Sequence, residues 1–175
     1  GTKSSYGYDY LIIANGSKPE FFGFEPENGG QLHTVHTLPA ATAFRKAVIE
    51  AGKGKQRPEV VVVGGGYTGL EIAASLRYGT QDSEVRPRIR IVELADEILA
   101  FLPEKTRERI QRYLQEQEIE LYTGTSLSRL DGDTAHLSNG DVIPEAVVCW
   151  SAGMRASQGD TVGELKRSKD GRIET

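Results

Sequence analysis

Apolar residues along the chain form short runs that alternate with helical stripes, a pattern typical of an α/β fold. Residues 59–63 carry four consecutive valines without alternation, which predicts a strand covered on both faces in a parallel sheet. Residues 89–93 and 119–122 predict two further strands, and residues 146–150 predict another covered strand. A short apolar run at residues 8–16 ends in Asn-Gly and predicts a buried strand followed by a turn.

Three helices are predicted between these strands. The first begins at residues 37–39, where Pro39 occupies the first turn, and it ends at Gly52. The second follows Gly69 directly, and the third opens at Pro103. Residues 127–140 instead predict a compact antiparallel meander with two Gly-containing turns. Residues 17–36 and the chain beyond Met154 show no period, which indicates linkers.

These elements predict a Rossmann-like parallel sheet flanked by helices, with the antiparallel meander inserted before the last strand.

The chain has 175 residues, of which 38% are hydrophobic, which suits one packed domain. Lys and Arg total 21 against 25 Asp and Glu, so the balance argues against nucleic acid as a partner. The chain lacks an initiating Met, and we expect a fragment.

Cysteine and histidine content further limits the chemistry. A single cysteine, Cys149, excludes an internal disulfide and a dithiol redox pair, and we expect it to be a buried core residue. Together with only three histidines this argues against a metal site. No apolar run approaches the roughly 20 residues that span a bilayer, and residues 1–5 form no signal peptide. A reducing, cytoplasmic setting is expected.

The loop between the valine strand and the second helix reads Gly-x-Gly-x-x-Gly. Gly64 permits a tight turn, Gly66 lets phosphates approach the backbone, and Gly69 lets the helix pack close to the strand. A dinucleotide diphosphate would lie on the unpaired N–H groups of the helix that begins near Tyr67. The alternative is a glycine-rich turn without a ligand.

Glu93 ends the next strand, slightly later than the usual spacing of about 20 residues after the glycines. A carboxylate there accepts hydrogen bonds from the adenosine ribose hydroxyls and repels a 2′-phosphate. Leu94 and its neighbours supply no arginine that could bind such a phosphate. The sequence therefore favours NADH over NADPH. The alternative is a solvent-exposed acid at the end of a strand.

Three ordered motifs now resemble one family. Residues 64–71 read Gly-Gly-Gly-Tyr-Thr-Gly-Leu-Glu, which is similar to the NADH loop of the type II NADH dehydrogenases (NADH:quinone oxidoreductases). Residues 8–16 and 147–153 resemble the segments in which that family's chain leaves and re-enters its flavin domain, and residues 170–173 resemble a later turn. The family belongs to the two-dinucleotide-domain flavoproteins related to the pyridine nucleotide-disulfide oxidoreductases.

This resemblance implies a domain layout and a reaction. Residues 1–36 would be the crossing segment and linker from a flavin domain, 37–153 the NADH-binding domain, and 154–175 the return linker. The full-length enzyme would pass a hydride from NADH to FAD and electrons to a quinone, at the cytoplasmic face of a membrane. The chain itself lacks the family's flavin motifs, so we expect it to bind NADH without FAD and to be inactive alone. A homodimer is left open.

The predicted cofactor-binding residues lie in the glycine loop, after the second strand and after the last strand: Gly64, Gly65, Gly66, Tyr67, Thr68, Gly69, Glu71, Glu93, Leu94, Ser151, Ala152 and Gly153. The resemblance places Glu71 at the nicotinamide end, whereas a carboxylate there also stabilises a helix N-terminus by about 0.3–1 kcal/mol. Tyr67 either covers the diphosphate or caps the helix. Ala152 and Gly153 would approach the nicotinamide half.

Other functions remain open on the sequence. The same domain serves ferredoxin reductases and disulfide reductases, and a non-catalytic NAD(H)-sensing module uses the same fold. An S-adenosylmethionine methyltransferase also has a Gly-rich first loop, but it lacks the third glycine at this spacing.

Overall fold

The computed structural model describes residues 6–10, 12–54, 57–83, 85–157, 166–168 and 172–174. Two compact units are present: Pro19–Met154 is one, and the described parts of Gly1–Lys18 and Arg155–Thr175 make up the other. The first unit holds nearly all the regular structure. Part of the turn predicted at residues 170–173 lies outside the described residues.

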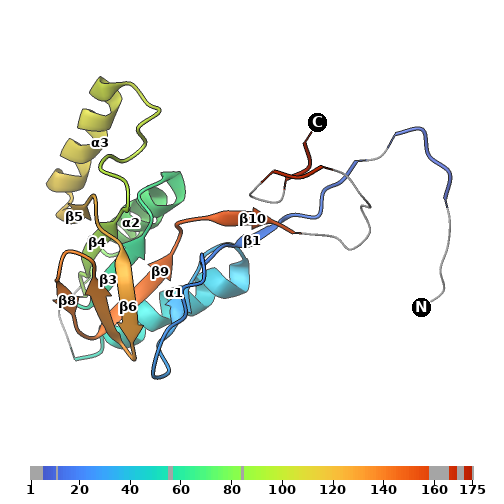
Figure 1. Ribbon diagram of the computed structural model, residues 1–175. Coiled ribbons are helices and arrows are strands. Elements are labelled where there is room, and N and C mark those ends of the chain that lie inside the picture. The colour runs from blue at the N-terminus through green and yellow to red at the C-terminus, as the bar shows by residue number, and fades with distance from the viewer. Residues whose placement is uncertain are drawn as a thin grey trace. The chain divides into compact units, whose positions relative to one another are not determined.

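The first unit is built on a five-stranded parallel sheet in the order β2-β9-β3-β4-β5 (Figure 1). Every neighbouring pair runs parallel. The strands are β2 (Leu32–His33), β3 (Glu59–Val63), β4 (Arg88–Val92), β5 (Ile119–Tyr122) and β9 (Ala146–Trp150). The prediction of a parallel sheet from the valine run is therefore confirmed, and β3 lies at its centre.

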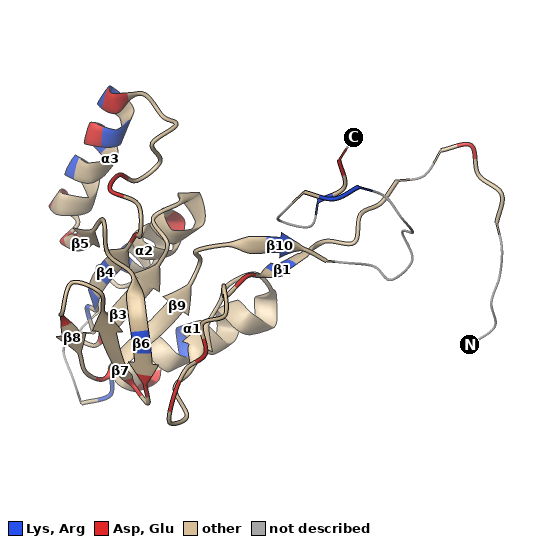
Figure 2. Cartoon of the chain, in the orientation of Figure 1, with Lys and Arg blue, Asp and Glu red and all other residues tan. Residues whose placement is uncertain are grey.

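Three helices cover one face of this sheet: α1 (Leu38–Ala51), α2 (Tyr67–Gly79) and α3 (Glu104–Glu116). Thr37 caps α1 by accepting a hydrogen bond from the backbone N–H of Ala40 at 3.3 Å. Charged residues are distributed along α3, as the blue and red segments of its ribbon show (Figure 2), and Leu114 is the one buried residue of that helix. The predicted helix starts are confirmed, and Ile110 packs beside Leu114 as a partly buried residue.

An antiparallel meander covers the other face, as predicted. Its strands are β6 (Leu127–Asp131), β7 (Thr134–Leu137) and β8 (Val142–Ile143). Successive side chains of a strand point to opposite faces. Val60 and Val62 accordingly pack in the helix-side core, while Val61 and Val63 pack with the meander. All four valines are at most 6% exposed, which explains the lack of alternation in that run.

Residues 17–36 differ from the linker that their aperiodic sequence indicates. They contain β1 (Ser17–Pro19), which forms a two-stranded sheet with β10 (Met154–Ala156), and they supply β2 to the edge of the main sheet. Phe21 and Phe24 pack against Trp150 with ring centroids 5.8 and 5.4 Å away. These contacts join residues more than 120 positions apart, so local periodicity carries no trace of them.

The strand predicted at residues 8–16 is not present in the described part of that segment. Residues 8–10 and 12–16 have no regular secondary structure, and Tyr10 and Ile12 are 93% and 90% exposed. A strand covered on both faces requires neighbouring strands, and among the described residues this segment belongs to no strand pair. At its end the carbonyl oxygen of Gly16 accepts a hydrogen bond from the N–H of Ser157 at 2.9 Å. Its apolar pattern is therefore not matched by burial here.

Candidate functional site

The turn between β3 and α2 is closed by direct contact between backbone atoms. Gly64 has φ of +108°, and a Cβ added there would lie 2.8 Å from the nitrogen and Cα of Ala152. A Cβ added at Gly69 would lie 1.9 Å from the carbonyl oxygen of Gly64. Both positions require glycine, one because of its backbone conformation and the other because the helix packs directly against the end of the strand.

Gly66 behaves differently from the other two motif glycines. An added Cβ would meet nothing within 4 Å, and φ of −74° with ψ of −176° is open to any residue. Gly66 is the N-cap of α2, and neither a capping side chain nor an acidic residue serves the first turn of that helix. The N–H groups of this turn have no partners within the helix and carry a partial positive charge. They border the open space at Gly66, so a phosphate group could bind there.

Glu93 lies in direct contact with this turn. One carboxylate oxygen accepts a hydrogen bond from the backbone N–H of Gly65 at 2.7 Å, and the other accepts one from Ala95 at 2.8 Å. A Cβ added at Gly65 would lie 3.0 Å from Cβ of Glu93 and 2.8 Å from Cγ2 of Ile98. The carboxylate is therefore held beside the glycine turn, where a sugar next to a bound diphosphate would lie. Leu94 is 73% exposed.

Ser151 follows β9 and holds the turn from the other side. Its backbone N–H and its hydroxyl both donate to the carbonyl oxygen of Val63, at 2.8 and 2.9 Å. The hydroxyl is also 3.3 Å from the carbonyl oxygen of Gly64. Ser151 thus shapes the turn through backbone contacts, and Ala152 next to it lies against Gly64. The structure brings the predicted residues of three separate segments together at the carboxyl ends of β3, β4 and β9.

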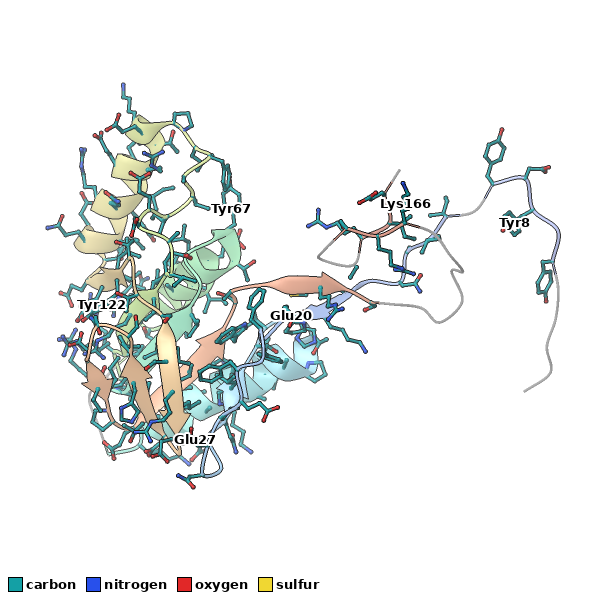
Figure 3. The ribbon with its side chains drawn as sticks, viewed as in Figure 1. Tyr8, Glu20, Glu27, Tyr67, Tyr122 and Lys166 are labelled. Atoms are coloured by element: carbon teal, nitrogen blue, oxygen red, sulfur yellow. The ribbon has the colours of Figure 1, made fainter. Side chains whose placement is uncertain are left out.

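Three large apolar residues at this edge were not among the predicted residues. The ring of Phe101 meets the ring of Tyr67 edge-on, with centroids 5.8 Å apart; Figure 3 labels Tyr67 at the start of α2. Ile98 is buried under Gly65, and Phe22 lies over Gly153. Each belongs to a loop without a spacing rule. For Phe22 and Phe101 the only signal in the sequence was an aromatic residue in a loop, and Ile98 carried no such signal.

Glu71 is exposed and lies further along α2. It borders two hollows, one of about 660 Å³ between α1 and α2 and one of about 460 Å³ between α2 and α3. Thr68 also lines the larger hollow, whose walls are mainly apolar side chains from α1 and α2. The residues described above bound the glycine turn, and Glu71 is not one of them. Its role at the nicotinamide end therefore stays a prediction.

In the described part of the chain, no three His, Cys, Asp or Glu residues are grouped so that they could hold a metal ion. Cys149 is fully buried in β9, and burial raises the pKa of its thiol to about 12. The prediction that Cys149 is a core residue is confirmed. Within the same described residues, no helix has the length and apolarity that crossing a membrane requires.

The family model described as pyridine nucleotide-disulphide oxidoreductase matches residues 1–175. A probable ferredoxin reductase, CtmF, of Castellaniella defragrans is 28% identical over 96% of this chain and 42% of its own length. The demethylphylloquinone reductase NdbB of Synechocystis is 34% identical over 90% of the chain and 39% of its own length. The chain thus spans about two fifths of these relatives.

Among solved structures, NDH2 of Plasmodium falciparum in complex with NADH is similar to the chain with a TM-score of 0.69 at 21% identity. The similarity covers 86% of this chain and 35% of that protein. At this identity the likeness concerns the fold.

Proposed function

Because the chain belongs to the pyridine nucleotide-disulphide oxidoreductase family, we propose that residues 37–153 are the NADH-binding domain of a flavin-dependent NADH:quinone oxidoreductase. The observation that carries this proposal is the contact between Glu93 and Gly65 beside the open face of Gly66. A phosphate-binding turn and a sugar-binding carboxylate are thereby adjacent, as one dinucleotide requires.

In this proposal the chain binds and orients the cofactor. The diphosphate lies against the open side of Gly66 and accepts hydrogen bonds from the first-turn N–H groups of α2. The carboxylate of Glu93 accepts hydrogen bonds from the hydroxyls of the adjacent ribose, and its negative charge repels a 2′-phosphate. Ala152 and Gly153 lie toward the nicotinamide half, with Glu71 near that end. When bound, NADH supplies a hydride and FAD accepts it.

The remaining parts of the proposal concern the full-length protein. Residues 1–18 and 155–175 connect this domain to a flavin domain, whereas residues 19–36 pack with the domain itself. The isolated chain binds NADH without turning over a quinone. The family resemblance supports action at the cytoplasmic face of a membrane, with quinone as electron acceptor, and a homodimer is compatible with it.

A second candidate is the NADH domain of a ferredoxin reductase. It is favoured by the probable ferredoxin reductase CtmF, which matches nearly the whole chain. The two candidates share the cofactor site and differ in the acceptor. Steady-state assays of the full-length protein with a quinone and with a ferredoxin separate them.

Calorimetric titration of the chain with NADH and NADPH tests the cofactor assignment. We expect NADH to bind at least about tenfold more tightly, and we expect Glu93→Gln to reduce that preference to within about threefold because the repelling charge is lost. Glu97→Gln is the matched control, since this exposed acid lies in the same loop and pairs with Arg107 at 3.2 Å. Equal affinity for both cofactors would contradict the role of Glu93, and binding of neither would contradict the proposed function.

A further inference from the structure

Phe22 occupies a backbone position that its side chain does not favour. Residues 21–24 form a turn closed by a hydrogen bond from the N–H of Phe24 to the carbonyl oxygen of Phe21 at 2.8 Å. Phe22 and Gly23 have φ of +51° and +77°, the two positive values of a type I′ turn. Asn, Asp and Gly are favoured at the first of these positions. The turn by itself therefore gives no reason for a phenylalanine there.

The turn is fixed to the end of β9 by contacts on both sides. The rings of Phe21 and Phe24 pack on Trp150, and the indole N–H of Trp150 donates to the carbonyl oxygen of Glu20 at 2.8 Å. The N–H of Glu20 donates to the carbonyl oxygen of Gly153 at 3.0 Å. Glu20, labelled in Figure 3, thus joins the turn to the point where β9 leaves the sheet.

The ring of Phe22 is directed away from this apolar packing. Phe22 is 71% exposed, whereas Phe21 and Phe24 are partly buried. Its ring lies over Gly153, where an added Cβ would be 2.8 Å from two ring carbons. The next residue back, Ala152, lies against Gly64. The aromatic face, the end of β9 and the glycine turn are therefore consecutive neighbours along one edge of the sheet.

We propose that the ring of Phe22 forms an aromatic wall of the nicotinamide end of the site and positions the pyridine ring of the bound cofactor. This inference rests on the proposed function, because it takes Ala152 and Gly153 as neighbours of the nicotinamide half. Phe22 supplies a flat apolar face that a planar heterocycle can stack on or meet edge-on. Residues held in sparsely populated backbone conformations cluster at ligand-binding sites, and Phe22 combines such a conformation with an exposed ring.

The test compares NADH with ADP-ribose, which carries the diphosphate and adenosine but no nicotinamide. Isothermal titration of the full chain measures both affinities for the wild type and for Phe22→Asn, which removes the ring and suits the type I′ turn. We expect Phe22→Asn to weaken NADH binding about 3- to 10-fold while ADP-ribose binding changes less than about twofold. Phe22→Tyr keeps the ring, and we expect it to retain wild-type NADH affinity.

Leu94→Ala is the matched control, because Leu94 is a comparably exposed apolar residue on the adenosine side and its loss should affect both ligands alike. Nuclear Overhauser contacts from nicotinamide protons to a phenylalanine ring, lost in Phe22→Asn, give a second readout. A folded Phe22→Asn that binds NADH like the wild type, or that loses NADH and ADP-ribose equally, overturns the inference. A wild type that binds neither ligand overturns the proposed function instead.

Discussion

Two glycines of the same motif are predicted to fail in opposite ways when each is replaced by alanine. At Gly69 the new Cβ would lie 1.9 Å from the carbonyl oxygen of Gly64, so either the helix or the strand end must move. At Gly66 the new Cβ meets open space, and the backbone conformation suits alanine. Gly69→Ala should therefore damage the fold, whereas Gly66→Ala should damage only cofactor binding.

The magnitudes follow from the contacts. Overpacking against backbone costs about 3 kcal/mol at the upper end of its usual range, which for a chain of this size lowers the melting temperature of Gly69→Ala by about 6–12 °C. Gly66→Ala loses a preferred N-cap residue, worth up to about 1 kcal/mol. The lower entropy of its unfolded chain offsets this by a similar amount, so its melting temperature should stay within about 2 °C of the wild type.

Thermal unfolding followed by circular dichroism and calorimetric titration with NADH measure the two properties separately. The methyl group of Gly66→Ala stands where the diphosphate would meet the backbone, and we expect NADH affinity to fall at least about tenfold, or roughly 1.4 kcal/mol. Gly79→Ala, at the other end of α2, is a control for glycine replacement, since an added Cβ there meets nothing within 4 Å and its φ is not positive. The reasoning is refuted if Gly66→Ala binds NADH normally or if Gly69→Ala melts with the wild type.

Three further predictions concern stability and reactivity. Arg77 is 1% exposed and donates to the carbonyl oxygens of Gln117 and Glu118 at 2.7 and 3.1 Å. Arg77→Met should therefore lower the free energy of unfolding, measured by urea titration, by about 2–4 kcal/mol. A loss below about 0.5 kcal/mol would contradict this. Burial raises the pKa of Glu120, but hydrogen bonds from Arg88 and Tyr122 outweigh it and hold this pKa below the ordinary 4.5. Its stabilising effect is therefore present above pH 4.5 and lost as the pH falls through the lowered pKa, and melting temperatures from pH 7 to 3 should fall less steeply in Glu120→Gln. Cys149, with a pKa of about 12, should react with a thiol reagent at pH 8 only at the rate of unfolding, and rapid labelling of the native chain would exclude its burial.

The sequence was informative where short-range rules decide the structure. Four adjacent valines identified a central strand because only a strand covered on both faces tolerates such a run. Pro39 and Gly52 marked the ends of α1 through backbone chemistry that acts within one turn. The glycine spacing predicted a turn between β3 and α2 for the same reason, and the count of residues indicated Glu93 as the acid that ends the next strand.

The sequence was misleading where burial depends on distant partners. Arg77 interrupts the apolar face of α2 and yet is buried, because backbone carbonyls that follow α3 accept its hydrogen bonds. Residues 17–36 lack a period, but their phenylalanines pack on a tryptophan from the other end of the domain. Residues 8–16 have a strand-like pattern without a partner strand among the described residues.

What the sequence determined by itself is the central strands, the three helices, the meander and the glycine turn between β3 and α2, since hydrogen bonding and steric exclusion within a few residues fix them. Only the tertiary structure decided which side chains surround that turn. The contact of Glu93 with Gly65, the position of Ala152 against Gly64 and the ring of Phe22 over Gly153 all join segments separated by 28 or more positions. Such contacts arise from the packing of the whole sheet. Because the partners lie far apart in the chain, no local sequence pattern records them.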